Sequence, residues 1–266
     1  MRRALTLPIG LDVGATRIRL AVARVRNGTA RVEAIVGRDR RDDVSPAALV
    51  REAWAELDVP ERRCVLALGS PEAELRPATL RPHRMVGSAQ RAALEARLEA
   101  LAATPLQALA VDHESLALQR ALPGYRIVID AGYERTSLHL FDESPPRTMS
   151  IPCGGREIAL QIGRDLGIDA RSAEYRKRTL GVNGAGEASY ERLLAEIVAA
   201  MRSLHTGADR IALVGNNARL AGIAKDLASA CACTVDLPES ELLCGLDVAA
   251  AEWNLAAGLS IWMLGA

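Results

Sequence analysis

Aromatic residues are scarce in this sequence, and its charges are balanced. Phe, Trp and Tyr make up 3% of the 266 residues, and 33 basic residues face 33 acidic ones, for a formal net charge of zero. Stacking nucleic-acid bases takes several exposed rings, and binding nucleic acid or an anionic bilayer takes a basic patch. The composition therefore predicts no nucleic-acid partner.

Cysteine pairs and long apolar runs are also absent. The five cysteines include no Cys-x-x-Cys pair, so we expect reduced, buried thiols rather than a disulfide framework or a zinc site. The apolar stretch 255–266 falls short of the roughly 20 residues that cross a bilayer. Residues 1–7 are a short basic stretch leading into a strand, not a signal peptide. We expect a cytoplasmic protein without direct membrane insertion.

What is present is the composition of a folded protein. Hydrophobic residues make up 49% of the chain and charged residues 25%, both near the globular average. A chain of 266 residues has room for one large or two small domains with their own cores. We expect stability to come from hydrophobic packing.

Apolar periodicity divides the chain into alternating strands and helices. Residues 8–25 alternate as a β-hairpin, and Ser45-Pro46 marks a helix start, because serine caps a helix and proline suits its first turn. The proline- and arginine-rich segment 71–84 gives no clear element. The remaining predicted strands are 31–37, 64–68, the hairpin 127–141 and 211–214, and the predicted helices are 45–57, 89–102, 112–122, 155–166, 170–180, 189–204, one after Asn217 and one from Ala249.

The opening hairpin is repeated 118 residues later. Asp12-Val-Gly14 and Asp130-Ala-Gly132 are each followed by a second run of alternating apolar residues. A strand, an Asp-x-Gly turn and a second strand that occur twice predict two similar α/β halves, each opening with a hairpin.

An Asp-x-Gly turn is able to hold phosphate for a physical reason. Glycine lets the backbone come close, the N–H groups of the turn point into a concavity, and the carboxylate can hold magnesium through water. One such turn is weak evidence, because most are ordinary hairpin turns. Two of them, each at the head of an α/β half, predict a clamp on a polyphosphate.

At this point the sequence resembles the actin-like ATPase superfamily, and within it most closely the FtsA and PilM group, part of which belongs to bacterial type IV pilus assembly. The resemblance covers nearly the whole chain. It rests on the two Asp-x-Gly segments, on 111–121 as a connecting helix, on Gly154-Gly155 as a helix-opening loop, on the Ala173-Glu174-x-x-Lys177 segment, on Gly215-Asn216 as an adenosine loop, and on 255–259 as a closing helix that returns to the first domain.

The resemblance implies a role for each matching residue toward ATP and Mg²⁺. Asp12 and Asp130 would position the hydrated magnesium and count as catalytic and metal residues. The residues implied to bind the nucleotide are Asp12, Gly14, Ala15, Thr16, Arg19, Asp130, Gly132, Thr136, Gly154, Gly155, Glu174, Lys177, Gly215 and Asn216. Glu114 opens a Glu-x-x-Ala pattern and would orient the attacking water, with favourable interaction with the helix dipole as the alternative.

Two features depart from the family pattern. Asn216 stands where a second glycine usually lies, which puts nucleotide affinity in doubt, although Asn tolerates a positive φ better than other side chains. The inserted subdomain of the first domain, here about 70–110, is reduced, and we expect one or two helices in it.

The resemblance implies an actin-like, ribonuclease H-like α/β fold with two duplicated domains around a nucleotide cleft. Domain I would span 1–122 and be completed by the C-terminal helix 247–266, and domain II would span 123–246. The implied function is an ATP-binding cytoplasmic scaffold with at most slow ATPase activity, docked on the cytoplasmic tail of an inner-membrane assembly protein. A homo-oligomer or filament, a nucleotide-free scaffold and a small-molecule kinase of the same superfamily are the alternatives.

Overall fold

The computed structural model describes residues 5–78, 81–204 and 209–265 and divides the chain into two compact units. Unit 1 comprises the described residues of Met1–Pro123, Glu143–Pro146 and Glu239–Ala266. Unit 2 comprises those of Gly124–Asp142 and Arg147–Pro238.

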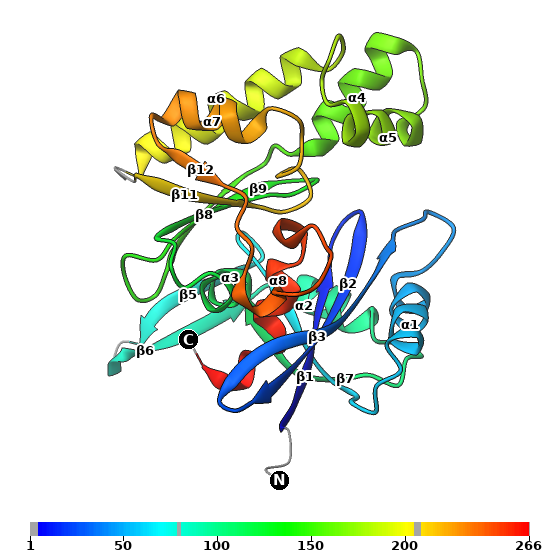
Figure 1. The fold of residues 1–266 in the computed structure, drawn as a ribbon, viewed down its shortest axis with the longest axis vertical. Coiled ribbons are helices and arrows are strands. Elements are labelled where there is room, and N and C mark those ends of the chain that lie inside the picture. The colour runs from blue at the N-terminus through cyan, green and yellow to red at the C-terminus, as the bar shows by residue number, and fades with distance from the viewer. Residues whose placement is uncertain (1–4, 79–80, 205–208, 266) are drawn as a thin grey trace. The chain divides into compact units, whose positions relative to one another are not determined.

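A five-stranded mixed sheet forms the centre of unit 1, with the strand order β3-β2-β1-β4-β7. Strands β1, β2 and β3 are antiparallel, whereas β4 and β7 run parallel to β1. The strands are β1 (Leu5–Val13), β2 (Arg17–Arg26), β3 (Thr29–Asp39), β4 (Arg63–Leu68) and β7 (Gln107–His113). The helices are α1 (Pro46–Leu57), α2 (Arg91–Glu99), α3 (Glu114–Ala121) and α8 (Asn254–Ser260), with the short 3₁₀ segments η1 (Glu241–Leu243), η2 (Ala250–Glu252) and η3 (Trp262–Leu264) (Figure 1).

Unit 2 repeats this arrangement with the strand order β10-β9-β8-β11-β12. Its strands are β8 (Ile127–Ala131), β9 (Thr136–Leu140), β10 (Arg147–Ile151), β11 (Arg210–Val214) and β12 (Thr234–Asp236). Its helices are α4 (Gly155–Leu166), α5 (Ala170–Leu180), α6 (Glu187–Ser203) and α7 (Ile223–Cys231).

The two hairpins also agree in register. Asp12 lies opposite Arg19 in the first hairpin, and Asp130 lies opposite Ser137 in the second. Both pairs are separated by the same 118 residues as the two motifs. The predicted duplication of an α/β half is therefore confirmed at the level of strand order and pairing.

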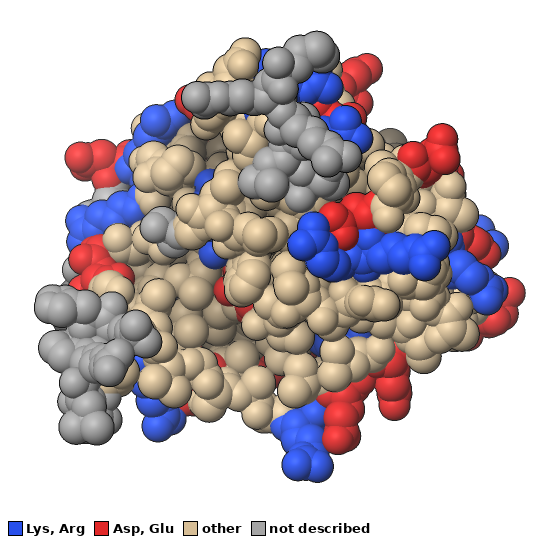
Figure 2. All heavy atoms as spheres, turned by 90° about the horizontal axis from the view of Figure 1, so that it is seen from below, with Lys and Arg blue, Asp and Glu red and all other residues tan. Residues whose placement is uncertain are grey.

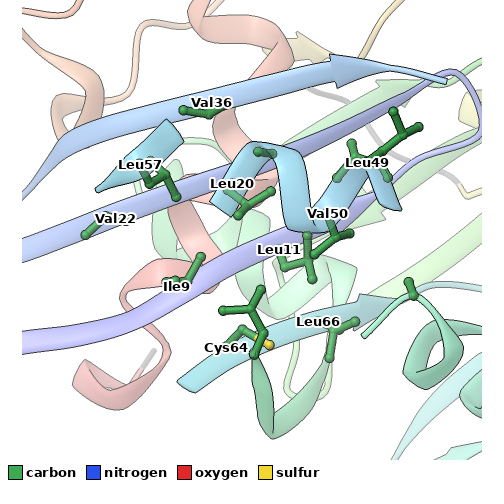
Figure 3. Packing of buried hydrophobic residues seen from close by; sticks show 14 residues of the cluster. Ile9, Leu11, Leu20, Val22, Val36, Leu49, Val50, Leu57, Cys64 and Leu66 are labelled. Atoms are coloured by element: carbon green, nitrogen blue, oxygen red, sulfur yellow. The ribbon is translucent and has the colours of Figure 1, made fainter. Parts of the chain in front are cut away.

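Alternating side chains build the main core of unit 1. Ile9 and Leu11 of β1 and Leu20 of β2 are fully buried on one face of the sheet, because residues two apart along a strand point to the same side. Helix α1 covers this face with Leu49 and its neighbours one turn apart (Figure 3). Ser45 caps this helix, since its side chain accepts a hydrogen bond from the Ala48 N–H at 3.2 Å.

Two glycines allow helix α8 to pack closely within unit 1. A Cβ on Gly10 of β1 would lie 2.0 Å from the Ala256 carbonyl oxygen, and a Cβ on Gly258 would lie 1.9 Å from that of Ala117 in α3. Backbone at these distances leaves no room for any side chain. Helix α8 therefore packs directly between strand β1 and helix α3.

The structure differs from the sequence prediction near residues 107–113. This segment is strand β7, and the helix predicted over 112–122 begins only at Glu114. The strand is at the edge of the sheet, and its first residues Gln107 to Leu109 are exposed, so the sequence shows no alternation. His113 still has extended backbone angles and caps the helix with its ring.

Other element predictions need correction too. Besides helix α2, the segment around 70–110 contains the antiparallel hairpin of β5 (Ala73–Ala78) and β6 (Arg81–Ala89), where only helices were expected. Strands β10 and β12 were not predicted. The helix after Asn217 begins at Ile223, and the closing helix begins at Asn254 rather than Ala249.

Candidate functional site

The carboxyl ends of the parallel strands of unit 1 carry its candidate residues. Asp12 is near the end of β1, Gly69 follows β4, and Glu114 follows β7. Because these strands are parallel, their carboxyl ends meet at one edge of the sheet, where open α/β sheets bind ligands. A Cβ on Gly69 would lie 1.8 Å from Glu114 Oε2, so the carboxylate of Glu114 rests against the Gly69 backbone.

The turn after β1 has the geometry expected for close backbone approach. The Gly14 N–H donates to the Arg17 carbonyl at 3.0 Å, and a Cβ on Gly14 would lie 2.9 Å from the same oxygen. Ala15 is exposed at the tip, and Thr16 is partly buried. The tip of the turn is therefore accessible at Ala15, whereas the Gly14 N–H already has a partner within the turn.

Asp12 is not a free carboxylate. Arg19 Nη1 donates to Asp12 Oδ2 at 3.1 Å, and Arg19 Nη2 lies 3.4 Å from Oε2 of Glu252. The Arg19 guanidinium also lies 5.9 Å from the ring centroid of Trp253. The side chain of Arg19 is 4% exposed, and those of Asp12 and Glu252 are 15% and 14% exposed.

This network changes what Asp12 can do. Removing one partner of a buried ion pair costs about 3–5 kcal/mol, because the remaining charge is left uncompensated. A hydrated magnesium at Asp12 would have to compete with a guanidinium that is always charged. The carboxylate of Asp12 in this arrangement does not fit the magnesium role implied by the family resemblance.

In unit 2, the corresponding edge brings Asp130 and Gly215 together. Gly215 follows β11 with a φ of +90°, and a Cβ there would lie 2.2 Å from Asp130 Oδ1. Only glycine satisfies both conditions. Asn216 is partly buried and is not among the described non-glycine residues with positive φ, so the turn does not depend on the φ tolerance of asparagine.

The second Asp-x-Gly turn packs on the N-terminus of α4. The Gly155 N–H donates to the Gly132 carbonyl at 3.1 Å, and the Arg156 N–H donates to the Tyr133 carbonyl at 2.8 Å. A Cβ on Gly154 would lie 2.4 Å from the Tyr133 carbonyl oxygen. These N–H groups of the helix therefore bind protein carbonyls, and the two glycines serve the close packing of the turn.

Asn217 holds these loops together. Its side-chain amide donates to the Gly132 carbonyl, and its backbone N–H donates to the Ala131 carbonyl at 2.9 Å. It is 3% exposed, and its amide leaves no room for a Cβ on Gly155. Asn217 was not among the predicted site residues, whereas its neighbour Asn216 was.

Lys177 is buried under the same loops. Its ammonium donates to the Gly155 carbonyl at 3.0 Å, lies 2.9 Å from Glu174 Oε2, and is 5.2 Å from the Tyr133 ring centroid. Burial lowers the pKa of Lys177, and Glu174 opposes that shift. With 2% of its surface exposed, Lys177 fixes the position of the α4 N-terminus rather than offering a cation to solvent.

Thr136 is fully buried, and its hydroxyl donates to the Cys153 carbonyl at 3.0 Å. This hydroxyl secures the loop before α4 and has no exposed surface for a ligand. Direct nucleotide binding by Thr136 therefore does not fit this structure.

Two charged residues near the first turn, Arg17 and Glu252, were not among the predicted site residues. Arg17 Nη1 lies 3.4 Å from Glu252 Oε2, and Arg17 also lies over Trp253 at 5.8 Å from its ring centroid. Trp253 is buried, with 5% of its surface exposed. The available signal was Arg17 and Arg19 two residues apart on one strand, which places both on one face.

Within residues 5–78, 81–204 and 209–265, no three His, Cys, Asp or Glu side chains are grouped closely enough to hold a metal ion. In the same ranges, no helix has the length and apolar character needed to cross a bilayer.

Comparison with known proteins finds similarity in structure only. No family model and no curated protein matches the sequence. The PilM–PilN type IV pilus biogenesis complex matches with a TM-score of 0.78 at 21% identity, over 97% of this chain and 99% of that chain. A MamK double helical filament matches with a TM-score of 0.64 at 12% identity, over 98% and 99%.

A third match is the activator of 2-hydroxyisocaproyl-CoA dehydratase from Clostridium difficile with bound ADPNP. It has a TM-score of 0.61 at 12% identity, over 96% of this chain and 93% of that chain. All three cover nearly the whole of both chains. The chain has the actin-like fold. The predicted fold class is thus confirmed, and the Asp-x-Gly turns are the hairpin turns of the two actin-like sheets.

Proposed function

We propose that the chain is an ATP-binding cytoplasmic scaffold of a membrane-associated assembly, such as the inner-membrane complex of a type IV pilus. The observation that carries the proposal is the match to the PilM–PilN complex over 97% of this chain and 99% of that one. Similarity along the full length, rather than in one unit, favours a shared architecture over a shared motif. Any ATP hydrolysis would be slow.

The ATP part of the proposal is supported by the two Asp-x-Gly turns. Gly14 and Gly132 share one close approach, since a Cβ on either would collide with the carbonyl oxygen three residues later, at 2.9 and 2.6 Å. Their N–H groups differ, because Gly14 donates to the Arg17 carbonyl and Gly132 donates to the Asp130 carbonyl. Ala15 is exposed, so the backbone of the first turn is accessible. The activator with bound ADPNP has the same fold. We assign phosphate binding to these turns, and nucleoside binding to the loop at Gly215 and Asn216.

The residues of the first Asp-x-Gly turn suit magnesium less well than they suit phosphate. Asp12 is ion-paired with Arg19, as described above. When present, magnesium supplies charge neutralisation to the phosphates. Arg19 already neutralises part of the charge of Asp12 and Glu252.

A protein partner is supported by apolar side chains on the surface of unit 1. Six large hydrophobic side chains there are 39–54% exposed, namely Met85, Val86, Leu98, Leu109, Met263 and Leu264. On the face shown in Figure 2, uncharged residues cover the middle while charged residues of both signs lie mainly toward the edge. Such a surface suits a protein partner better than a polyanion. We propose the cytoplasmic tail of an inner-membrane assembly protein, with a filament of this chain as the alternative.

Two measurements test the proposal. Isothermal titration of ATP with Mg²⁺ into the full chain is expected to give saturable heat. Co-purification with the cytoplasmic tail of an inner-membrane assembly protein is expected to recover a complex, and a Met85→Glu/Val86→Glu double variant is expected to weaken it. If the wild type binds neither ATP nor the tail, the proposal is contradicted.

A nucleotide-free scaffold is the second candidate, and a specific observation favours it. The Gly155 and Arg156 N–H groups and the carboxylate of Asp12 already have partners within the protein. On this alternative, the tail binds and ATP gives no heat. The same pair of measurements therefore separates the two candidates.

A further inference from the structure

The first Asp-x-Gly turn contains its own cation. Arg19 projects from β2 beneath this turn, with Nη1 3.9 Å from the position a Cβ on Gly14 would take. The guanidinium contacts Asp12 on one side and Glu252 on the other, at 3.1 and 3.4 Å. Arg19 as a whole, backbone included, has 3% of its surface exposed. A buried guanidinium between two carboxylates is a fixed positive charge directly under the turn.

The second carboxylate comes from the C-terminal part of the chain. Glu252 is the last residue of η2, and Trp253 follows it immediately. Glu252 Oε2 lies 3.4 Å from both Arg17 Nη1 and Arg19 Nη2, and both guanidiniums lie over the Trp253 ring. Glu252 and Trp253 therefore set the position of two arginines at once.

We infer that Arg19 is a built-in counter-cation for Asp12, so that the first turn takes up polyphosphate without magnesium at Asp12, and that Glu252 is the positioning residue that holds Arg19 there. This inference rests on the proposed function, because it concerns how the same turn binds the phosphates of ATP.

Electrostatics supports this assignment. The Arg19 guanidinium repels a dication that comes close to it. It also neutralises the carboxylate of Asp12, with Nη1 3.1 Å from Oδ2. Arg17 and Arg19 lie two residues apart behind the turn, where Asp12, Glu252 and Asp39 pair with them. The charges of the two arginines are therefore balanced within the cluster, and Glu252 fixes the geometry of both guanidiniums.

The primary test is titration of ATP and of inorganic tripolyphosphate into the full chain, once with Mg²⁺ and once with EDTA. The inference predicts affinities that agree within about threefold between the two conditions. An isosteric Asp12→Asn variant should keep its affinity or bind more tightly, because it removes a negative charge and keeps Arg19 in place.

Glu252 is tested by a matched pair of variants. Glu252→Gln removes the charge that holds Arg19, so it should weaken tripolyphosphate binding about fivefold at low salt and change its dependence on salt concentration, whereas a charge effect alone would tighten binding. Glu252→Asp should restore the wild-type salt dependence. Glu56→Gln is the control, because Glu56 lies on α1 and pairs with Arg38 instead.

The outcomes separate the inference from the proposed function. ATP binding that needs Mg²⁺ and is abolished in Asp12→Asn overturns the inference and leaves the ATP-binding proposal intact. An unchanged tripolyphosphate affinity in Glu252→Gln overturns the positioning role. Absence of ATP binding in the wild type under both conditions contradicts the proposed function itself.

Discussion

The two actin-like units carry the same turn on the same sheet but support it by different means. In unit 1 the residue opposite the motif aspartate is Arg19, and the support is a cluster of charges that reaches Glu252. In unit 2 the opposite residue is Ser137, and the turn is held by neutral hydrogen bonds from Asn217 and the α4 N-terminus. A duplicated backbone therefore fixes the shape of the turn but leaves its electrostatics free to diverge.

The aromatic residues allow each unit to be followed separately. All three Trp lie in unit 1, and all four Tyr lie in unit 2. Unfolding in urea followed by Trp fluorescence reports on unit 1, and Tyr emission reports on unit 2. The four predictions below use this division and run from the largest expected effect to the smallest.

Arg19→Met should destabilise unit 1 by about 3–5 kcal/mol, because it leaves the largely buried carboxylate of Asp12 without its cation and leaves Glu252 with Arg17 alone. Ser137→Ala, at the equivalent position of unit 2, should cost less than about 1 kcal/mol. Urea unfolding by the two fluorescence signals measures both. Equal costs would show that the ionic support of unit 1 is an incidental contact.

Gly215→Ala should destabilise unit 2 by about 2–4 kcal/mol, since it adds strain at positive φ to a collision with Asp130. Gly184 also has a positive φ but open space around it, so Gly184→Ala isolates the strain and should cost about 1 kcal/mol. The Tyr-detected transition gives both values. If the two substitutions cost the same, the contact between Asp130 and Gly215 has no energetic role.

Asn217→Ala should cost unit 2 about 0.5–1.5 kcal/mol, because the Gly132 carbonyl loses one of its two donors and keeps only the Gly155 N–H. Exposed Asn183 supplies the control, and Asn183→Ala should change stability by no more than about 0.5 kcal/mol. The variant should also loosen the second turn, seen as faster amide exchange at Ala131–Tyr133. Exchange at the wild-type rate would contradict the role given to Asn217.

His113 should make a small, pH-dependent contribution that is confined to unit 1. Burial holds the pKa of His113 below its usual 6.5, and its ring lies 2.6 Å from Ser115 Oγ. As the pH falls below 6.5, the unfolded chain takes up the proton first, so stability falls until the folded-state pKa is reached.

His113→Gln should remove this loss, so between pH 7 and 5 the wild type should lose more unfolding free energy than the variant. The Tyr signal of unit 2 should be unaffected. A difference of the opposite sign would mean that His113 is charged in the folded protein.

The sequence was sufficient for features that depend on local pattern. The two hairpins, the Ser45 cap and helices α4 and α5 follow from alternation, capping and helical spacing within a few residues. The opposition of Asp12 and Arg19 also follows from hairpin register once the turn is located.

Features that depend on contacts between distant segments were not predictable in this way. Glu252 meets Arg19 only because α8 packs against β1 through Gly10, and nothing near Glu252 in the sequence signals that contact. Strand β7 lacks alternation because it lies at an exposed edge. Asn217 could not be distinguished from Asn216, because only the folded loops decide which amide turns inward.

The most direct test of phosphate binding at the first turn is a calorimetric titration of ATP into the wild type and an Ala15→Asp variant. Ala15 is exposed at the tip of the turn, so the new carboxylate can be accommodated without disturbing the core. The account predicts saturable binding to the wild type, an affinity at least about tenfold lower for Ala15→Asp through charge repulsion, and unchanged binding for Ala15→Ser. Equal ATP affinity in the wild type and Ala15→Asp would contradict it.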